Sequence, residues 1–147
     1  MATKFVFGQV PMSVMTGALA LVTSAGLLLI HAVPLFHPSW YAGYPPTTVI
    51  LTIVLFAVFS GALILVPLLS ALFALRGRRW PTFVATGFAI LTMIGVLDAA
   101  ATFVAGAVAA LAGAVLLWMP SAREFGRAAE QDRRSRRGLV EPRRTVR

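Results

Sequence analysis

Long apolar runs and short polar breaks alternate along the chain. Residues 12–34, 47–75 and 80–119 are almost entirely apolar, and the breaks between them are a proline- and aromatic-rich stretch at 35–46 and the basic stretch RGRRW. A helix rises about 1.5 Å per residue, so roughly 20 residues cross a hydrocarbon core of about 30 Å. The pattern therefore predicts membrane-spanning helices over 12–34 and 47–75.

The third apolar run is too long for one crossing. As a single helix, residues 80–119 would reach about 60 Å, twice the hydrocarbon thickness. Only Asp98 interrupts the run with a charge. Two spans over 81–97 and 99–119, meeting at Asp98, account for its length, although the first of them is near the lower limit for a crossing.

Three interpretations of Asp98 are open: a helix cap at an outer turn, a functional acid inside the membrane, or part of a three-span layout. Basic residues favour the cytoplasmic side of a membrane. Lys4, the cluster at 76–79 and the C-terminal tail are all basic, and placing them on one side requires an even number of crossings. We therefore expect Asp98 to cap the fourth span, in a bundle with both termini in the cytoplasm.

Composition agrees with a membrane protein. Hydrophobic residues make up 59% of the 147 residues and charged residues 12%, against about 25% charged in soluble domains. The first run is longer than a signal-peptide core, so we expect it to be retained. The prediction is an all-α, polytopic four-helix transmembrane domain over residues 1–120 with short loops, followed by a basic cytoplasmic tail over 121–147.

Small residues on the fourth span predict close helix packing, because small side chains let helix backbones approach in lipid. One ridge at four-residue spacing consists of Thr102, Gly106, Ala110 and Ala114. A neighbouring ridge consists of Ala101, Ala105, Ala109 and Gly113. Packing inside the bundle and docking on a helix of another protein are both open for these ridges.

Candidate chemistry is sparse. The chain has no cysteine, which excludes disulfides and thiol catalysis. A zinc site needs three or four ligands, and the outer side offers only His31, His37 and Asp98, so no metal or other cofactor is expected. His31 and Asp98 both map to the outer boundary, where they are a candidate pH-sensitive pair. No nucleophile–base set or phosphate loop is present, and we expect no enzymatic activity.

The tail predicts a short surface helix to about residue 134 and disorder beyond it, because Gly138 and Pro142 disfavour helix. Anionic lipid headgroups are the favoured ligands of its arginines, an acidic protein surface is the alternative, and nucleic acid is not expected because stacking aromatics are lacking. The basic residues concerned are Arg76, Arg78, Arg79, Arg123, Arg127, Arg133, Arg134, Arg136 and Arg137.

The stretch LLWMPSAREFGRAAEQ and the short-loop layout resemble the small four-span inner-membrane proteins of actinobacteria. That group includes accessory subunits of larger envelope complexes, such as lipid importers or respiratory assemblies. The resemblance implies a bacterial inner-membrane location and a non-catalytic accessory or assembly role within a larger membrane complex. A small homo-oligomeric transporter or channel that uses Asp98 or His31 is the alternative.

Overall fold

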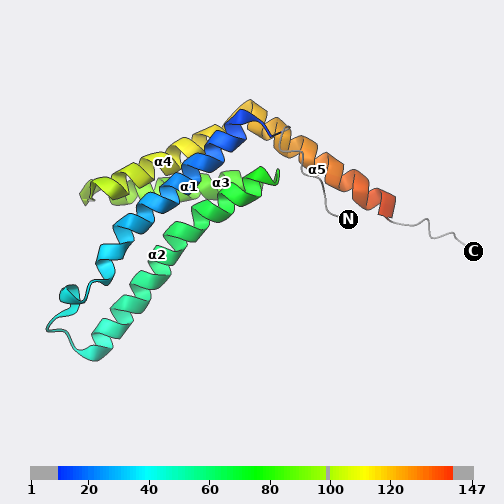
Figure 1. Ribbon diagram of the computed structural model, residues 1–147. Helices are drawn as coiled ribbons and strands as arrows, with labels where there is room; N and C mark the ends of the chain where they lie inside the picture. The colour runs from blue at the N-terminus through cyan, green and yellow to red at the C-terminus, as the bar shows by residue number, and fades with distance from the viewer. Residues whose placement is uncertain (1–9, 99, 141–147) are drawn as a thin grey trace, which may run out of the picture.

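A computed structural model describes residues 10–98 and 100–140 of the chain (Figure 1). Every element in these residues is helical, so the prediction of an all-α chain is confirmed. The elements in chain order are α1 (Met12–Ala32), η2 (Val33–Phe36), η3 (Pro38–Tyr41), α2 (Pro46–Leu75), α3 (Trp80–Ile94), η4 (Gly95–Asp98), α4 (Ala101–Trp118) and α5 (Pro120–Val140). The three η elements are short 3₁₀ helices.

Helices α1 to α4 form two hairpins that pack against each other. The α1–α2 hairpin turns through η2 and η3, and the α3–α4 hairpin turns through η4 (Figure 1). Helix α4 runs antiparallel to α1, since Ser13 bonds to Ser121 at one end of the pair and His31 contacts Phe103 at the other. The start of α1, the α2–α3 turn and the end of α4 therefore share one end of the bundle.

Glycine allows α1 and α4 to approach closely. A Cβ atom added at Gly113 would lie 2.8 Å from Leu21 Cγ and 3.0 Å from the Gly17 carbonyl oxygen. One added at Gly106 would lie 3.0 Å from Leu28 Cγ. Beside that contact, the buried Ser24 hydroxyl donates a hydrogen bond of 2.8 Å to the Gly106 carbonyl. Close backbone approach and an interhelical hydrogen bond are the interactions that hold helices together in lipid.

The two ridges of small residues on α4 have different surroundings. The buried members of the first ridge are Gly106, Ala110 and Ala114. Its remaining member, Thr102, is half-buried. On the second ridge Gly113 is buried and Ala109 is half-buried, whereas Ala101 and Ala105 are exposed. The first small-residue ridge of α4 thus lies mostly inside the bundle, whereas the first half of the second ridge, Ala101 and Ala105, is exposed.

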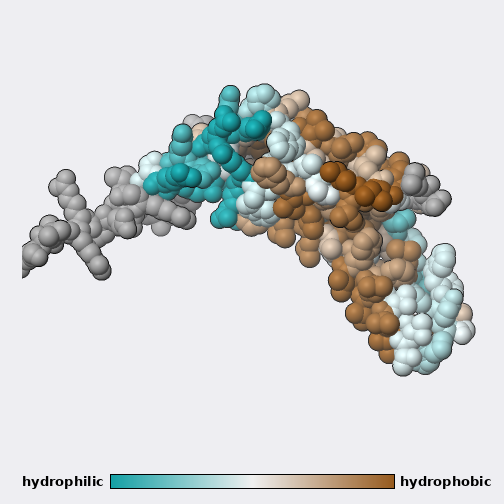
Figure 2. All heavy atoms as spheres, turned by 180° about the vertical axis from the view of Figure 1, so that it is seen from behind, coloured by the Kyte–Doolittle hydropathy of each residue, from teal (hydrophilic) through white to brown (hydrophobic). Residues whose placement is uncertain are grey.

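The outer surface of the bundle is apolar. Leu51 and Val58 on α2, for example, are 70% and 68% exposed. Figure 2 shows the apolar surface as a brown band between the teal residues of α5 and the paler residues of the α1–α2 loop. Among the described residues, three helical segments are long and apolar enough to cross a membrane: Met12–Phe36, Pro46–Leu75 and Ala101–Trp118. Helix α3 is apolar but shorter, with 15 residues. These are the features of a membrane protein.

The expected helix cap at Asp98 is wrong. The N-cap residue of α4 is Ala100, which makes no side-chain hydrogen bond, and Asp98 is the last residue of η4. A 3₁₀ turn ends the α3 segment and shifts the start of α4 by two residues beyond the expected position. The chain nevertheless reverses direction between α3 and α4, close to Asp98.

The tail helix is longer than expected. Helix α5 runs from Pro120 to Val140, so the predicted end near residue 134 is wrong. A single glycine costs a helix only about 1 kcal/mol, and the tail is rich in Arg and also contains Ala and Glu, all of which favour helix. Gly138 therefore does not end it. The disorder predicted beyond it falls partly on residues 141–147, which lie outside the described residues.

The α1–α4 contact predicts that Gly113→Ala destabilises the bundle. The added methyl group would overlap Leu21 and press on the backbone of α1, and overpacking of this kind costs about 1–3 kcal/mol. Gly26→Ala on α1 is the matched control, because no atom lies within 4 Å of the added Cβ. Unfolding of the purified protein in detergent, followed by circular dichroism, measures both. Equal stability of the two variants would contradict the contact.

Candidate basic interface between the α2–α3 turn and α5

The α2–α3 turn, residues 76–79, is built around a glycine. Gly77 has a φ of +66°, and its N–H donates to the Ala74 carbonyl at 2.9 Å. The N–H of Arg78 donates to the Phe73 carbonyl at 3.0 Å. These two bonds are the Schellman pattern, which ends a helix where glycine adopts the left-handed conformation. The turn thus reverses the chain within four residues, three of which are arginines.

Helix α5 packs against this turn through small residues. Its buried residues here are Ala122 and Gly126, and Ala129 is half-buried. A Cβ atom added at Gly77 would lie 2.5 Å from the Ala129 Cβ, and one added at Gly126 would lie 3.3 Å from Arg79 Cγ. A side chain in place of either glycine would push α5 away from the turn. Gly77 therefore has two roles: it ends α2, and because it has no side chain it lets α5 pack against the turn.

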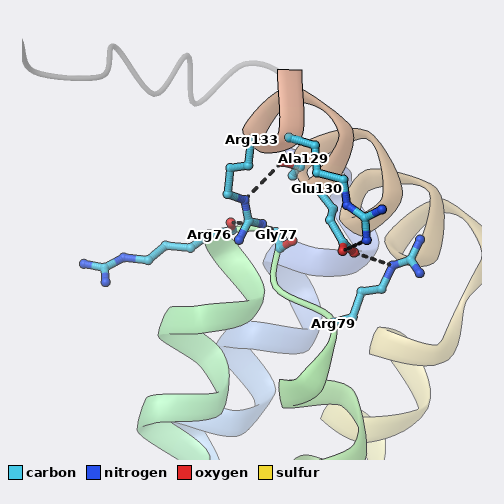
Figure 3. Close-up of polar contacts among 7 residues, drawn as sticks. Arg76, Gly77, Arg79, Ala129, Glu130 and Arg133 are labelled. Carbon is cyan, nitrogen blue, oxygen red and sulfur yellow. Dashed lines mark hydrogen bonds and ion pairs between the residues drawn. The ribbon is translucent and has the colours of Figure 1, made fainter. Parts of the chain in front are cut away.

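Arg133 joins α5 to the end of α2. Its Nη2 atom donates to the Gly77 carbonyl at 2.7 Å and to the Arg76 carbonyl at 3.4 Å, and its Nε donates to the Ala129 carbonyl at 3.1 Å (Figure 3). Carbonyl groups at a helix C-terminus lack partners within the helix and carry partial negative charge. A guanidinium group supplies both the hydrogen bonds and the opposite charge, so Arg133 caps the C-terminal end of α2.

Glu130 is the acidic centre of the interface. Its Oε2 lies 3.7 Å from Arg79 Nε, and its Oε1 accepts a hydrogen bond of 2.8 Å from Arg134 Nη2 (Figure 3). The hydrogen bond and charge of Arg134 lower the pKa of Glu130, and the charges of Arg79 and Arg133 lower it further. The carboxylate is therefore ionised at neutral pH. It joins the turn to α5 and leaves most of the positive charge around it uncompensated.

The start of α5 is anchored at two further points. Ser121 and Ser13, at the start of α1, share a hydrogen bond of 2.8 Å. Just before α5, Trp118 Nε1 donates to Thr86 Oγ1 on α3 at 2.7 Å, and the Trp118 ring packs edge-on against Phe83 at 5.5 Å. The first turns of α5 are thus fixed relative to α1, α3 and α4.

The structure separates the predicted arginines into groups. Arg79, Arg133 and Arg134 meet at Glu130, in a groove of about 440 Å³. A second groove is lined by arginines of the turn and of the first half of α5, namely Arg78, Arg79, Arg123 and Arg127. The Arg76 side chain points away from α5 (Figure 3). The side chains of Arg136 and Arg137 lie outside the described part of the chain.

The sequence indicates the arginines as contacts for lipid or a partner, whereas the structure shows that three of them, Arg79, Arg133 and Arg134, form contacts within the chain. The Glu130–Arg134 pair has four-residue spacing on a predicted helix, which was an available signal. The contacts of Arg79 with Glu130 and of Arg133 with Gly77 join residues about fifty positions apart. No sequence pattern indicates such contacts.

The predicted pair of His31 and Asp98 stays a prediction. His31 is half-buried, and its ring packs against the Phe103 ring with centroids 5.2 Å apart. Phe103 also lies beside Gly95, where an added Cβ would be 3.2 Å from the ring. His31 therefore lies at the end of the bundle opposite the α2–α3 turn, near the segment that leads to Asp98. The side chain of Asp98 itself is outside the described residues.

The packing of α5 on the turn predicts that Gly77→Ala loosens α5. A left-handed conformation costs a non-glycine residue about 1–2 kcal/mol, and contact with Ala129 adds to this cost. Gly43→Ala is the matched control: Gly43 also has positive φ, at 90°, but no atom lies within 4 Å of an added Cβ. Trypsin should cleave within 123–134 several-fold faster in Gly77→Ala than in Gly43→Ala. Equal cleavage rates would show that the turn does not hold α5.

No protein-family model, no curated protein and no solved structure matches the chain. The helices and their contacts therefore carry the functional argument.

Proposed function

We propose that this chain is a non-catalytic accessory or assembly subunit of a larger complex in a bacterial inner membrane. In this proposal four helices cross the membrane, α5 lies at the cytoplasmic face, and both termini are cytoplasmic. In this role the chain binds other subunits and catalyses no reaction. Its binding surfaces are α5 with the basic turn at the cytoplasmic face, and exposed helix faces within the bilayer.

Four crossings are supported by helix lengths and by charge. The 15 residues of α3 and the four of η4 extend together for about 30 Å, enough for one crossing. The seven arginines whose side chains are described all lie on the α2–α3 turn or on α5, at one end of the bundle. The preference of basic residues for the cytoplasm then gives the orientation.

The exposed first half of the second small-residue ridge of α4 is the observation that carries the proposal. Ala101 and Ala105 are exposed, although the parallel ridge one position along the helix is packed against α1. Lipid chains cover any apolar surface, but a smooth ridge lets a second helix approach closely and gain packing energy. We assign this ridge to a helix of the partner complex.

A non-catalytic role is supported by the side chains present. His31 is the only ionisable residue in the described parts of α1 to α4, and it packs against Phe103. General acid–base catalysis requires a positioned proton donor or acceptor next to a reacting group. A transporter in which His31 or Asp98 lies in the solute path remains the competing proposal, and it requires a homo-oligomer.

The test is co-purification from the native membrane at native expression, in mild detergent, with partners identified by mass spectrometry. We expect a much larger membrane complex to accompany the wild-type chain. Ala105→Leu makes the ridge bulky and should reduce partner recovery several-fold. Ala62→Leu, the same change at an exposed site on α2, is the control and should retain the partner.

Recovery of the wild-type chain only as a monomer would contradict the accessory role. Recovery only as a homo-oligomer, together with loss of solute flux in Asp98→Asn proteoliposomes, would favour the transporter. Equal partner loss in Ala105→Leu and Ala62→Leu would show that the complex does not use the α4 ridge.

A further inference from the structure

A second basic groove lies beside the Glu130 contacts, where α3 begins and α4 meets α5. Its volume is about 190 Å³. Four of its lining residues are Arg78 and Arg79 from the turn and Arg123 and Arg127 from α5. The two arginines of α5 are four residues apart and so lie on the same side of the helix. None of the residues that line the groove is acidic.

The positive charge of this groove is largely uncompensated. Arg79 is paired with Glu130, whose carboxylate lines the neighbouring groove. Within the described residues, Arg78, Arg123 and Arg127 form no ion pair. Guanidinium groups bind phosphate through paired hydrogen bonds, and a bound anion would relieve repulsion among the arginines. The groove is therefore suited to a phosphate group.

An apolar wall adjoins these charges. Phe83 is 65% exposed and Trp118 is 39% exposed, and both line the groove. The Arg123 guanidinium lies 5.6 Å from the centre of the Trp118 ring, so charged and apolar surfaces are continuous. Trp118 is the last residue of α4. Tryptophan at the end of an apolar helix is typical of the headgroup level of a membrane.

We propose that this groove is a binding site for an anionic phospholipid of the cytoplasmic leaflet. Its phosphate lies among Arg78, Arg123 and Arg127, and its acyl chains extend along Phe83 and Trp118. A soluble phosphate would use the arginines but would leave the apolar wall unused. The site depends on the membrane orientation given above and is independent of whether the chain is an accessory subunit.

The test uses the full chain in vesicles and the fluorescence of Trp118. Replacing Trp40 and Trp80 with Phe leaves Trp118 as the only tryptophan. Brominated phosphatidylglycerol and brominated phosphatidylcholine are compared as quenchers, at equal mole fraction in phosphatidylcholine vesicles. Each basic residue near a membrane surface attracts anionic lipid by about 1 kcal/mol, so the anionic lipid should be preferred about fivefold or more.

Arg127→Gln should reduce this preference about fivefold. Arg134→Gln is the matched control: it removes the same charge from α5, but its side chain lies at the Glu130 groove. It should retain most of the preference. Arg123→Gln is a second test of the groove that does not depend on Arg127.

Three results would overturn the proposal. Equal quenching of wild-type Trp118 by the two lipids would show that the groove does not select anionic lipid. Equal losses in Arg127→Gln, Arg123→Gln and Arg134→Gln would indicate general surface attraction instead of a site. Loss of the preference on adding millimolar glycerol phosphate would identify a soluble anion as the ligand. Circular dichroism of each variant verifies that it has folded.

Discussion

The cost of placing a charged side chain in hydrocarbon constrains every other feature of this protein. That cost is about 2.5–3.5 kcal/mol for an arginine at the centre of a membrane helix. No charged residue occurs between Lys4 and Arg76, and only Asp98 occurs between Arg79 and Arg123. The antiparallel arrangement of α1 and α4 then brings the start of α1, the α2–α3 turn and the beginning of α5 to one end. The arginines lie at this end because both hairpins begin and end there.

Within that constraint, small residues determine which surfaces meet. Helix α1 packs closely on α4 at Gly17, Gly106 and Gly113, which have no side chains. Helix α5 packs on the α2–α3 turn at Gly77 and Gly126 for the same reason. At the basic end of the bundle, some of the charged side chains form contacts within the chain that hold α5 against the α2–α3 turn. Arg133 completes the end of α2, and Glu130 joins Arg79 to Arg134. The arginines that these contacts leave unpaired line the groove next to Trp118.

Helix positions were predictable because they follow from apolar length and the position of charge. The second span was expected over 47–75, and α2 runs from Pro46 to Leu75. The choice between the two ridges of α4 was not predictable, because both consist of equally small residues and only tertiary packing distinguishes them. The start of α4 at Ala101 was not predictable, because the short 3₁₀ turn before it has no sequence signal comparable to a polar cap. The docking of α5 was missed because it depends on a glycine and an arginine about fifty residues apart.

Cysteine accessibility measures the orientation of the bundle most directly. The chain has no cysteine, so a single one introduced at Ala100 or at Gln131, both exposed, reacts without background. In intact cells, a membrane-impermeant maleimide should label Ala100→Cys, and it should label Gln131→Cys only after the membrane is permeabilised. Labelling of Gln131→Cys in intact cells, with Ala100→Cys protected until permeabilisation, would reverse the orientation. Equal behaviour of the two sites would contradict the four-crossing arrangement itself.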